Sequence, residues 1–286
     1  MSKISYLLGS TLHYLSSKGC PSCGGNDVTI IDSKYIVTRL FKCEKCLLLF
    51  RHPKDSAEFN FKFYQKKYTQ KGLTTDLPSA EELESLKVNN FKGKTAAMYT
   101  DIFLELFKEV QPQKIKIVDY GCSWGYQSFQ FLKSGFDCNS FEISRPRAEY
   151  GNTHLGLAIK TEESELPLDN DIFFSCHVIE HVPSPGKMIE FGLDHLQRGG
   201  YFVAECPNGS DAFRKNKPEL FHLLWGRVHP NMLTAEYYAK VFENQPHFIT
   251  TSPFDNIVGE LRKWDGKSNK ILDLTGSELL VVAKKF

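Results

Sequence analysis

Two pairs of cysteines constrain this 286-residue chain more than any other feature. Two residues separate Cys20 from Cys23 and Cys43 from Cys46, and nineteen residues lie between the pairs. This spacing lets both sulfurs of a tight turn face one ion, and two such turns complete a tetrahedral site. We therefore predict a structural Zn²⁺ bound by all four thiolates. Because four protein ligands leave no open position, this metal is expected to stabilise a small domain rather than to catalyse.

The residues around these cysteines predict a zinc ribbon. Gly24 and Gly25 supply the backbone freedom that a turn after the first pair needs. Residues 28–32 and 35–41 are rich in β-branched and aromatic side chains, which predicts the two strands of a hairpin. A redox pair or unligated buried thiols are the alternatives to a metal. The other four cysteines are scattered singly through the chain: Cys122, Cys138, Cys176 and Cys206.

Composition narrows the function class. The chain has 35 basic and 34 acidic residues, a formal net charge of +1, which argues against a general nucleic-acid-binding protein. No apolar run approaches the roughly 20 residues that a membrane span needs. Residues 1–19 mix apolar with polar and charged side chains, unlike a signal peptide. We therefore expect a cytoplasmic, enzyme-like protein.

The remainder of the chain predicts a larger α/β domain. After a short helix with an aromatic stripe of Phe61, Tyr64 and Tyr68 comes a connector over residues 71–79. From about residue 91, apolar strands alternate with helices, which implies a mainly parallel sheet covered on both faces. The predicted strands cover residues 114–118, 137–141, 157–160, 171–176, 201–205, 247–250 and 278–283. We expect three segments: a zinc ribbon (1–55), an aromatic helix with linker (56–90) and the α/β domain (91–286).

The first strand of this domain ends in an informative stretch. It runs into Asp119, and then Gly121 and Gly125 precede a helix. Glycines there let the backbone approach a ligand closely, and the helix N-terminus offers free N–H groups. Glu142 ends the next predicted strand, 23 residues after Asp119, where a carboxylate can accept hydrogen bonds from two ribose hydroxyls. A plain turn followed by a helix-capping acid is the structural alternative.

Three motifs resemble those of class I S-adenosylmethionine-dependent methyltransferases. VDYGCSWG (Val118 to Gly125) is similar to the first motif, usually D-x-G-x-G-x-G, with Ser123 in place of the middle glycine. HVIEHV (His177 to Val182) and LQRGGYFVAECPN (Leu196 to Asn208) resemble the fourth- and fifth-strand motifs. The resemblance covers roughly residues 91–286 and implies a Rossmann-like sheet that binds S-adenosylmethionine.

By this resemblance, the methionine part of the cofactor would lie against Asp119 and Gly121. Its ribose would meet Glu142 and its adenine Glu162, with Glu163 and Asp169 as alternatives to Glu162. The complete set of implied cofactor-binding residues is Asp119, Gly121, Cys122, Gly125, Glu142, Glu162 and His177.

Methyl transfer to a hydroxyl requires an aligned nucleophile and the removal of its proton. His177, Glu180 and His181 follow the fourth strand, and His229 follows the fifth. In one hypothesis His181 or His229 is a general base. In a second, all four residues ligate a divalent cation, as the similar E-x-x-E-H motif does in small-RNA 2′-O-methyltransferases and ubiquinone-pathway O-methyltransferases; here His177 replaces the first glutamate. In a third, Glu180 and His181 only hold the loop.

The H-x-x-E-H pattern also matches a zinc-protease motif, which requires both histidines on one long helix. Pro183 and Pro185 would break such a helix, so we exclude a protease.

A zinc ribbon, an aromatic helix and a class I domain together resemble bacterial methyltransferases that act on sugars. We therefore expect a small-molecule acceptor, a saccharide or nucleotide-sugar that is O-methylated in a capsule, lipopolysaccharide or nucleotide-sugar pathway. Tyr64, Tyr68 and Trp225 are candidate pocket walls. The alternatives are a sugar C-methyltransferase, an RNA or protein methyltransferase that uses the ribbon for recognition, and an inactive binding or scaffold protein.

Overall fold

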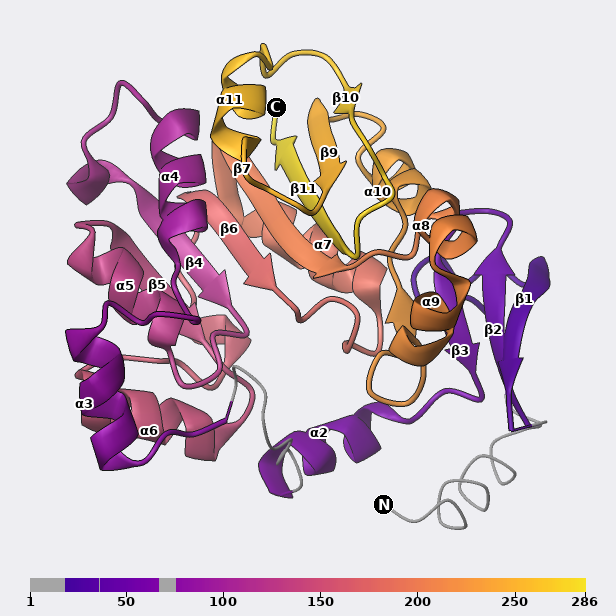
Figure 1. Cartoon of the computed structure of the whole chain (residues 1–286), viewed down its shortest axis with the longest axis horizontal. Coiled ribbons are helices and arrows are strands. Elements are labelled where there is room, and N and C mark those ends of the chain that lie inside the picture. Colours follow the sequence, from indigo (N-terminus) through magenta and orange to yellow (C-terminus); the bar gives the residue numbers. More distant parts are fainter. Residues whose placement is uncertain (1–18, 36, 67–75) are drawn as a thin grey trace.

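The computed structural model describes residues 19–35, 37–66 and 76–286, which form two sheets with surrounding helices (Figure 1). The larger sheet has seven strands in the order β10-β9-β11-β7-β6-β4-β5. Strands β5, β4, β6 and β7 are parallel, whereas β11 is antiparallel to both of its neighbours. The strands are β4 (Lys116–Tyr120), β5 (Asp137–Phe141), β6 (Asn170–Cys176), β7 (Leu196–Pro207), β9 (His247–Thr251), β10 (Lys270–Ile271) and β11 (Glu278–Lys284).

Helices cover both faces of this sheet, as the sequence predicts. Successive side chains of a strand point to opposite faces, so Ile172 and Phe174 pack in one apolar cluster with α4, α5 and α11. Phe173, between them, packs in another cluster with α7 and α10. The helices of this domain named so far, together with α6, have the following bounds: α4 (Ala97–Leu106), α5 (Tyr126–Lys133), α6 (Arg145–Leu155), α7 (Pro185–His195), α10 (Ala235–Val241) and α11 (Ile257–Arg262).

The predicted strand over residues 157–160 is wrong. The segment forms a single parallel bridge between Lys160 and Phe141. Lys160 makes both of its backbone hydrogen bonds with β5 and the residue that follows it, to the Ser140 carbonyl at 2.8 Å and from the Glu142 N–H at 3.0 Å, but the pairing extends no further. The backbone groups of the preceding Ile159 are bonded by the Asn152 side chain of α6, which accepts from its N–H at 2.7 Å and donates to its carbonyl at 3.3 Å.

The smaller sheet contains the predicted ribbon hairpin and a strand from a distant part of the chain. Its order is β1-β2-β3-β8, all antiparallel: β1 (Val28–Lys34), β2 (Thr38–Cys43), β3 (Leu49–His52) and β8 (Asn231–Met232). Figure 1 shows it beside α8 (Asp211–Asn216) and α9 (Pro218–Leu224), at the opposite end of the molecule from α5 and α6. The division into three segments stays a prediction, and β8 shows that the ribbon sheet continues into the larger domain.

The remaining helices connect these parts. They are α2 (Ala57–Lys66), α3 (Ala80–Val88), α8 (Asp211–Asn216) and α9 (Pro218–Leu224), with short 3₁₀ turns at Pro112–Lys114 and Glu163–Glu165. The predicted aromatic helix corresponds to α2, but Tyr68 and most of the predicted connector lie outside the described residues. No helix in the described part of the chain has the length and apolar character needed to cross a membrane.

Candidate active site

The loop between β4 and α5 has a shape that requires glycine at two positions. Gly121 and Gly125 have positive φ angles of 82° and 80°. A Cβ atom on Gly121 would lie 2.4 Å from the Val178 side chain, and one on Gly125 would lie 2.3 Å from Leu157. Conformation and close packing therefore both exclude larger residues. The loop lies at the carboxyl end of β4, where parallel sheets of this kind bind their ligands.

Ser123, which replaces the middle glycine of the motif, is accommodated by specific hydrogen bonds. Its φ of 56° is in the left-handed region that glycine adopts more easily. The Ser123 N–H donates to Glu142 Oε2 at 2.8 Å, and Arg147 Nη1 donates to Ser123 Oγ at 2.9 Å. The following Trp124 is fully buried in an apolar cluster with residues of α6. The loop with Ser123 is therefore bonded both to the predicted ribose-binding glutamate and to Arg147.

Two predicted cofactor-binding carboxylates lie at the ends of neighbouring strands and are both buried. Glu142 Oε1 accepts from the Ser144 N–H at 2.7 Å, and its Oε2 accepts from Ser123. A carboxylate has about four acceptor positions, so both oxygens retain capacity for ribose hydroxyls. Asp119 accepts from Ser128 Oγ of α5 at 2.6 Å. Burial raises the pKa of Asp119 to about 7; Ser128 opposes this shift and the charge of Glu142 adds to it.

The remaining predicted cofactor residues differ in exposure. Cys122 is buried in the loop, and burial raises its pKa well above the usual value. Glu162 is 61% exposed and forms an ion pair with Arg145 at 3.0 Å. Its neighbour Glu163 accepts a hydrogen bond from Tyr120. All of these assignments stay predictions.

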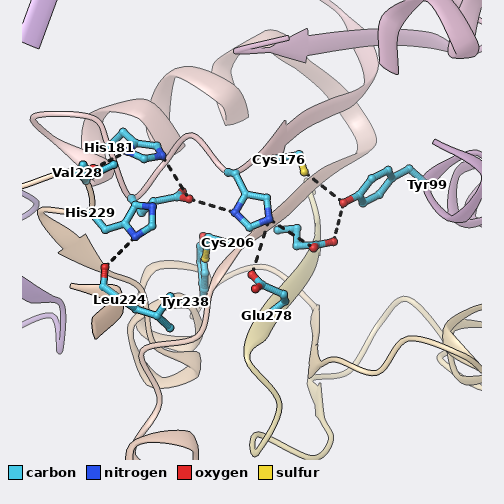
Figure 2. A network of polar contacts seen from close by, with 12 residues as sticks. Tyr99, Cys176, His181, Cys206, Leu224, Val228, His229, Tyr238 and Glu278 are labelled. Carbon is cyan, nitrogen blue, oxygen red and sulfur yellow. Dashed lines mark hydrogen bonds and ion pairs between the residues drawn. The ribbon is translucent and has the colours of Figure 1, made fainter. Parts of the chain in front are cut away.

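A connected polar network lies at the carboxyl ends of β6 and β7 (Figure 2). His177 follows β6 directly, with a φ of 54°, and its N–H donates to the Glu205 carbonyl at 2.8 Å. Its Nδ1 lies 3.4 Å from Glu180 Oε1, and its Nε2 lies 3.8 Å from Glu205 Oε1 and 3.7 Å from Glu278 Oε2. Burial alone would lower the pKa of His177, but Cys176 and these carboxylates hold it well above its usual value. The neighbouring carboxylates of Glu180 and Glu205 therefore favour the protonated form of His177.

On one side of the network, Glu180, His181 and His229 come together, with ligand atoms within 4.8 Å of one another. His181 Nδ1 is bonded to the Val228 carbonyl at 2.5 Å and His229 Nδ1 to the Leu224 carbonyl at 2.8 Å. Because a carbonyl only accepts, each Nδ1 carries the proton and each Nε2 presents a lone pair. Three of the four predicted cation ligands therefore meet, whereas His177 joins a different group.

The electrostatics of this cluster follow from its burial. Glu180 is fully buried, and neither of its carboxylate oxygens has a hydrogen-bond partner among the described residues. Burial would raise its pKa, but His181 first and then His177 and His229 hold it at about 2. Burial lowers the pKa of His181 to about 4, although Glu180 opposes this shift. At neutral pH the cluster is thus a carboxylate facing a neutral His181.

On the other side of the network, the structure adds residues that the sequence did not indicate. Tyr99 on α4 donates to Glu205 Oε2 at 2.7 Å and lies 3.2 Å from the sulfur of Cys176. Glu278 begins β11; burial raises its pKa to about 7, with His177 opposing and Glu205 adding to the shift. Figure 2 shows Tyr99 and Glu278 on the side of the network away from His181 and His229. Glu205 could have been noticed, because it ends a predicted strand; Glu278 could not.

The four ribbon cysteines form a separate cluster that fits a tetrahedral zinc ion. None of the four forms a disulfide, and their sulfur atoms lie within 4.8 Å of one another. The Cys20–Cys46 and Cys23–Cys43 sulfur pairs are each 3.5 Å apart. Sulfur ligands of a zinc ion with bonds of about 2.3 Å lie roughly 3.8 Å from each other. The donor set and spacing are therefore those of a structural site, and bound zinc would hold the two turns of the ribbon together.

Comparison with known proteins identifies the α/β domain. Residues 91–245, more than half of the chain, match the family model described as a methyltransferase domain. The chain belongs to this methyltransferase family. This membership confirms the enzyme class that the three motifs predict, a methyltransferase that uses S-adenosylmethionine. A search of curated proteins finds no match to this methyltransferase.

Several solved methyltransferase structures are similar to this chain at low sequence identity. The plantazolicin methyltransferase BpumL, in complex with S-adenosylhomocysteine (SAH) and a desmethylplantazolicin analogue, is 14% identical, with a TM-score of 0.49; 72% of this chain and 92% of that chain are covered. The geranyl diphosphate C-methyltransferase from Streptomyces coelicolor A3(2) is 14% identical with a TM-score of 0.49, covering 80% and 98%. A possible histamine N-methyltransferase from Thermotoga maritima is 15% identical with a TM-score of 0.42, covering 73% and 100%.

Proposed function

We propose that this methyltransferase transfers the methyl group of S-adenosylmethionine to a hydroxyl of a saccharide or related small metabolite. The observation that supports hydroxyl chemistry is the convergence of the His181 and His229 lone pairs on Glu180, next to the motif loop. The loop and the cluster are neighbours, because Gly121 packs directly against Val178. The saccharide assignment is supported by the resemblance of the combined ribbon, aromatic helix and class I domain to sugar methyltransferases.

In this reaction an acceptor oxygen attacks the methyl carbon, the carbon–sulfur bond breaks, and its electron pair stays on sulfur. The acceptor hydroxyl must lose its proton as the bond forms. The Nε2 atom of His181 or His229 can take this proton, because the Nδ1 proton of each ring is held by a main-chain carbonyl. Tyr64, whose ring lies 6.5 Å from that of His181, remains a candidate pocket wall.

Trp225 is not a pocket wall, and this prediction is wrong. The side chain is 1% exposed and packs in an apolar cluster of the ribbon and α9. Its Nε1 donates to Asp32 Oδ2 at 2.8 Å.

A second candidate role for the cluster is binding of a divalent cation. Carboxylate oxygens and two imidazole lone pairs are all acceptors, and a metal-binding histidine commonly donates its other ring N–H to a carbonyl, as His181 and His229 do. Glu180 has no hydrogen-bond donor among the described residues, which also favours a cation. Such a cation, when bound, would lower the pKa of an acceptor hydroxyl.

The test is a screen of nucleotide-linked and free sugars for methyl uptake from S-adenosylmethionine, with products identified by mass spectrometry. We expect His229→Ala to lower turnover by about 100-fold or more, the usual contribution of a general base. His154→Ala, which changes an exposed histidine on α6, is the matched control. A chelator that abolishes turnover, with recovery on adding divalent metal, would select the cation. Full activity of both His181→Ala and His229→Ala would refute the role of the cluster.

We also propose a cytoplasmic location. The eight cysteines, all of which lie in the described residues, form no disulfide with one another, and disulfides are rare in cytosolic proteins.

A further inference from the structure

The two histidine-bearing loops of the candidate site both contact the zinc ribbon. The first loop follows His181 and leads into α7. Its Ser184 Oγ donates to the Pro21 carbonyl, between the first two cysteines, at 2.8 Å. A Cβ atom on Gly186 would lie 2.6 Å from Ser22 Oγ and 2.9 Å from the Ser22 carbonyl oxygen, so this loop packs directly on the first cysteine turn. The same Ser22 Oγ lies 2.9 Å from the Tyr237 hydroxyl of α10.

The second loop, which carries His229, joins the ribbon as a strand. The Arg51 N–H of β3 donates to the Pro230 carbonyl at 2.7 Å, and β8 pairs with β3 through Asn231 and Met232. A strand of two residues has no independent stability, so β8 depends on β3 for its conformation. The position of β3 depends in turn on the second cysteine turn, in which the Cys43 N–H donates to the Leu48 carbonyl at 2.9 Å.

Asn231 then connects the two loops to each other. Its side-chain Nδ2 donates to the Val182 carbonyl at 2.8 Å and to the Glu180 carbonyl at 3.3 Å, and its N–H donates to the Glu180 carbonyl at 3.1 Å. Asn231 is 2% exposed, so these bonds are shielded from water. The strand that the ribbon holds is therefore bonded to the loop that presents the buried carboxylate.

A third contact fixes the acceptor of the His229 ring. Asp32 Oδ2 on β1 accepts from Trp225 Nε1 at 2.8 Å and from His222 Nδ1 at 2.7 Å. Between these residues lies Leu224, whose carbonyl accepts from His229 Nδ1. Asp32 thus holds both sides of the residue that orients the His229 ring, and Lys34 lies over the Trp225 ring, 4.5 Å from its centroid.

We propose that the zinc ribbon is a clamp that positions His181 and His229 against Glu180, with Asp32 as a positioning residue. The hydrogen bonds described above join the ribbon to the two histidine-bearing loops, so we expect it to act on the catalytic cluster more than on cofactor binding. The clamp is a geometric claim. Its effect on turnover rests on the proposed function.

The experiment compares Asp32→Ala with Asp27→Ala, a matched control that removes an exposed aspartate from the same ribbon. Hydrogen exchange with mass spectrometry measures the protection of residues 178–186 and 225–232. Calorimetry measures the affinity for SAH, and metal analysis measures the zinc content. We expect Asp32→Ala to raise exchange in residues 225–232 by about tenfold or more, with SAH affinity and zinc content unchanged within about twofold. Asp27→Ala should match the wild type. Asp32→Asn, which retains an oxygen acceptor, should restore part of the protection.

Removal of zinc from the whole protein is the second measurement. Removal of zinc with a chelator should raise hydrogen exchange in both segments, while SAH affinity stays within about twofold. Addition of zinc should lower the exchange to its original level. Unchanged exchange in both segments, or equal loss of SAH binding, would overturn the clamp. If exchange rises but turnover on an identified acceptor does not fall, the clamp stands and the proposed catalytic role of the histidines fails.

Discussion

Asp119 offers a sharp test of the electrostatics at the motif loop. The side chain is 2% exposed, and its pKa is about 7, raised chiefly by burial. In the unfolded chain an aspartate titrates near about 3.9. The folded protein therefore holds a proton on Asp119 that the unfolded chain releases. Replacement by asparagine keeps the shape and an acceptor for Ser128, but removes the charge.

The pH dependence of the free energy of unfolding follows from the difference between the folded and unfolded pKa values of Asp119. Because the pKa of Asp119 is higher in the folded protein than in the unfolded chain, the contribution of Asp119 to folding stability is fully present below about pH 3.9. This contribution is lost as the pH rises towards about 7. A shift of roughly three units corresponds to about 4 kcal/mol in total, at about 1.4 kcal/mol per unit. Between about pH 5 and pH 8, the wild type should lose about 2.5 kcal/mol through this group.

The assay is urea denaturation of wild type and Asp119→Asn at about pH 5 and pH 8, without cofactor. The wild-type free energy of unfolding should fall by about 2.5 kcal/mol more than that of the variant over this interval. Groups that do not interact with Asp119 cancel in the comparison; Glu142, whose charge contributes to the shift, does not. Equal pH dependence in the two proteins would refute the proposed burial of a titrating carboxyl at this position.

Three further outcomes are expected. Glu142→Gln should weaken SAH binding by about 1–3 kcal/mol through lost hydrogen bonds, measured by calorimetry; unchanged affinity would remove Glu142 from the cofactor site. Glu278→Gln should reduce the loss of stability that accompanies a rise in pH from about 4.5 to about 7, because the folded pKa of Glu278 is raised from 4.5 to about 7; an unaltered profile in denaturation experiments would contradict this assignment. Cys43→Ser should lower bound zinc and thermal stability together, as metal analysis and calorimetry would show, since a structural zinc site contributes directly to folding; full zinc content would exclude Cys43 as a ligand.

The elements with strong local patterns were predictable from the sequence. The β4 loop could be recognised because glycines at 121 and 125 are required by both backbone conformation and packing. The cysteine cluster could be recognised because tetrahedral coordination dictates the spacing of its ligands. The strand predicted over residues 157–160 failed because only Lys160 pairs with β5, and hydrophobicity does not reveal how far such a pairing extends along the chain.

The candidate site could be predicted only in part. His181 and Glu180 follow a predicted parallel strand, and the carboxyl ends of such strands meet at one edge. That rule does not predict the position of Glu278, because Glu278 begins its strand rather than ending it. It reaches the same edge of the sheet because β11 runs antiparallel to β7. The sequence also could not predict that His177 lies in a different group from His181 and His229, since all three histidines lie near the same buried carboxylate, Glu180.

The arrangement of the two sheets explains why the residues proposed to act on the acceptor are harder to predict from the sequence than those implied in cofactor binding. Strands β4 and β5 carry the motif loop and Glu142, so the order of the large sheet positions the residues implied in cofactor binding. After β7 the chain leaves that sheet and returns only at β9, and β8 is the one strand that it forms in between. Since β8 pairs with the ribbon, the conformation around His229 depends on cysteines about 200 residues away. If the proposed function holds, a sequence change in the ribbon should therefore lower turnover of the acceptor while every methyltransferase motif stays intact.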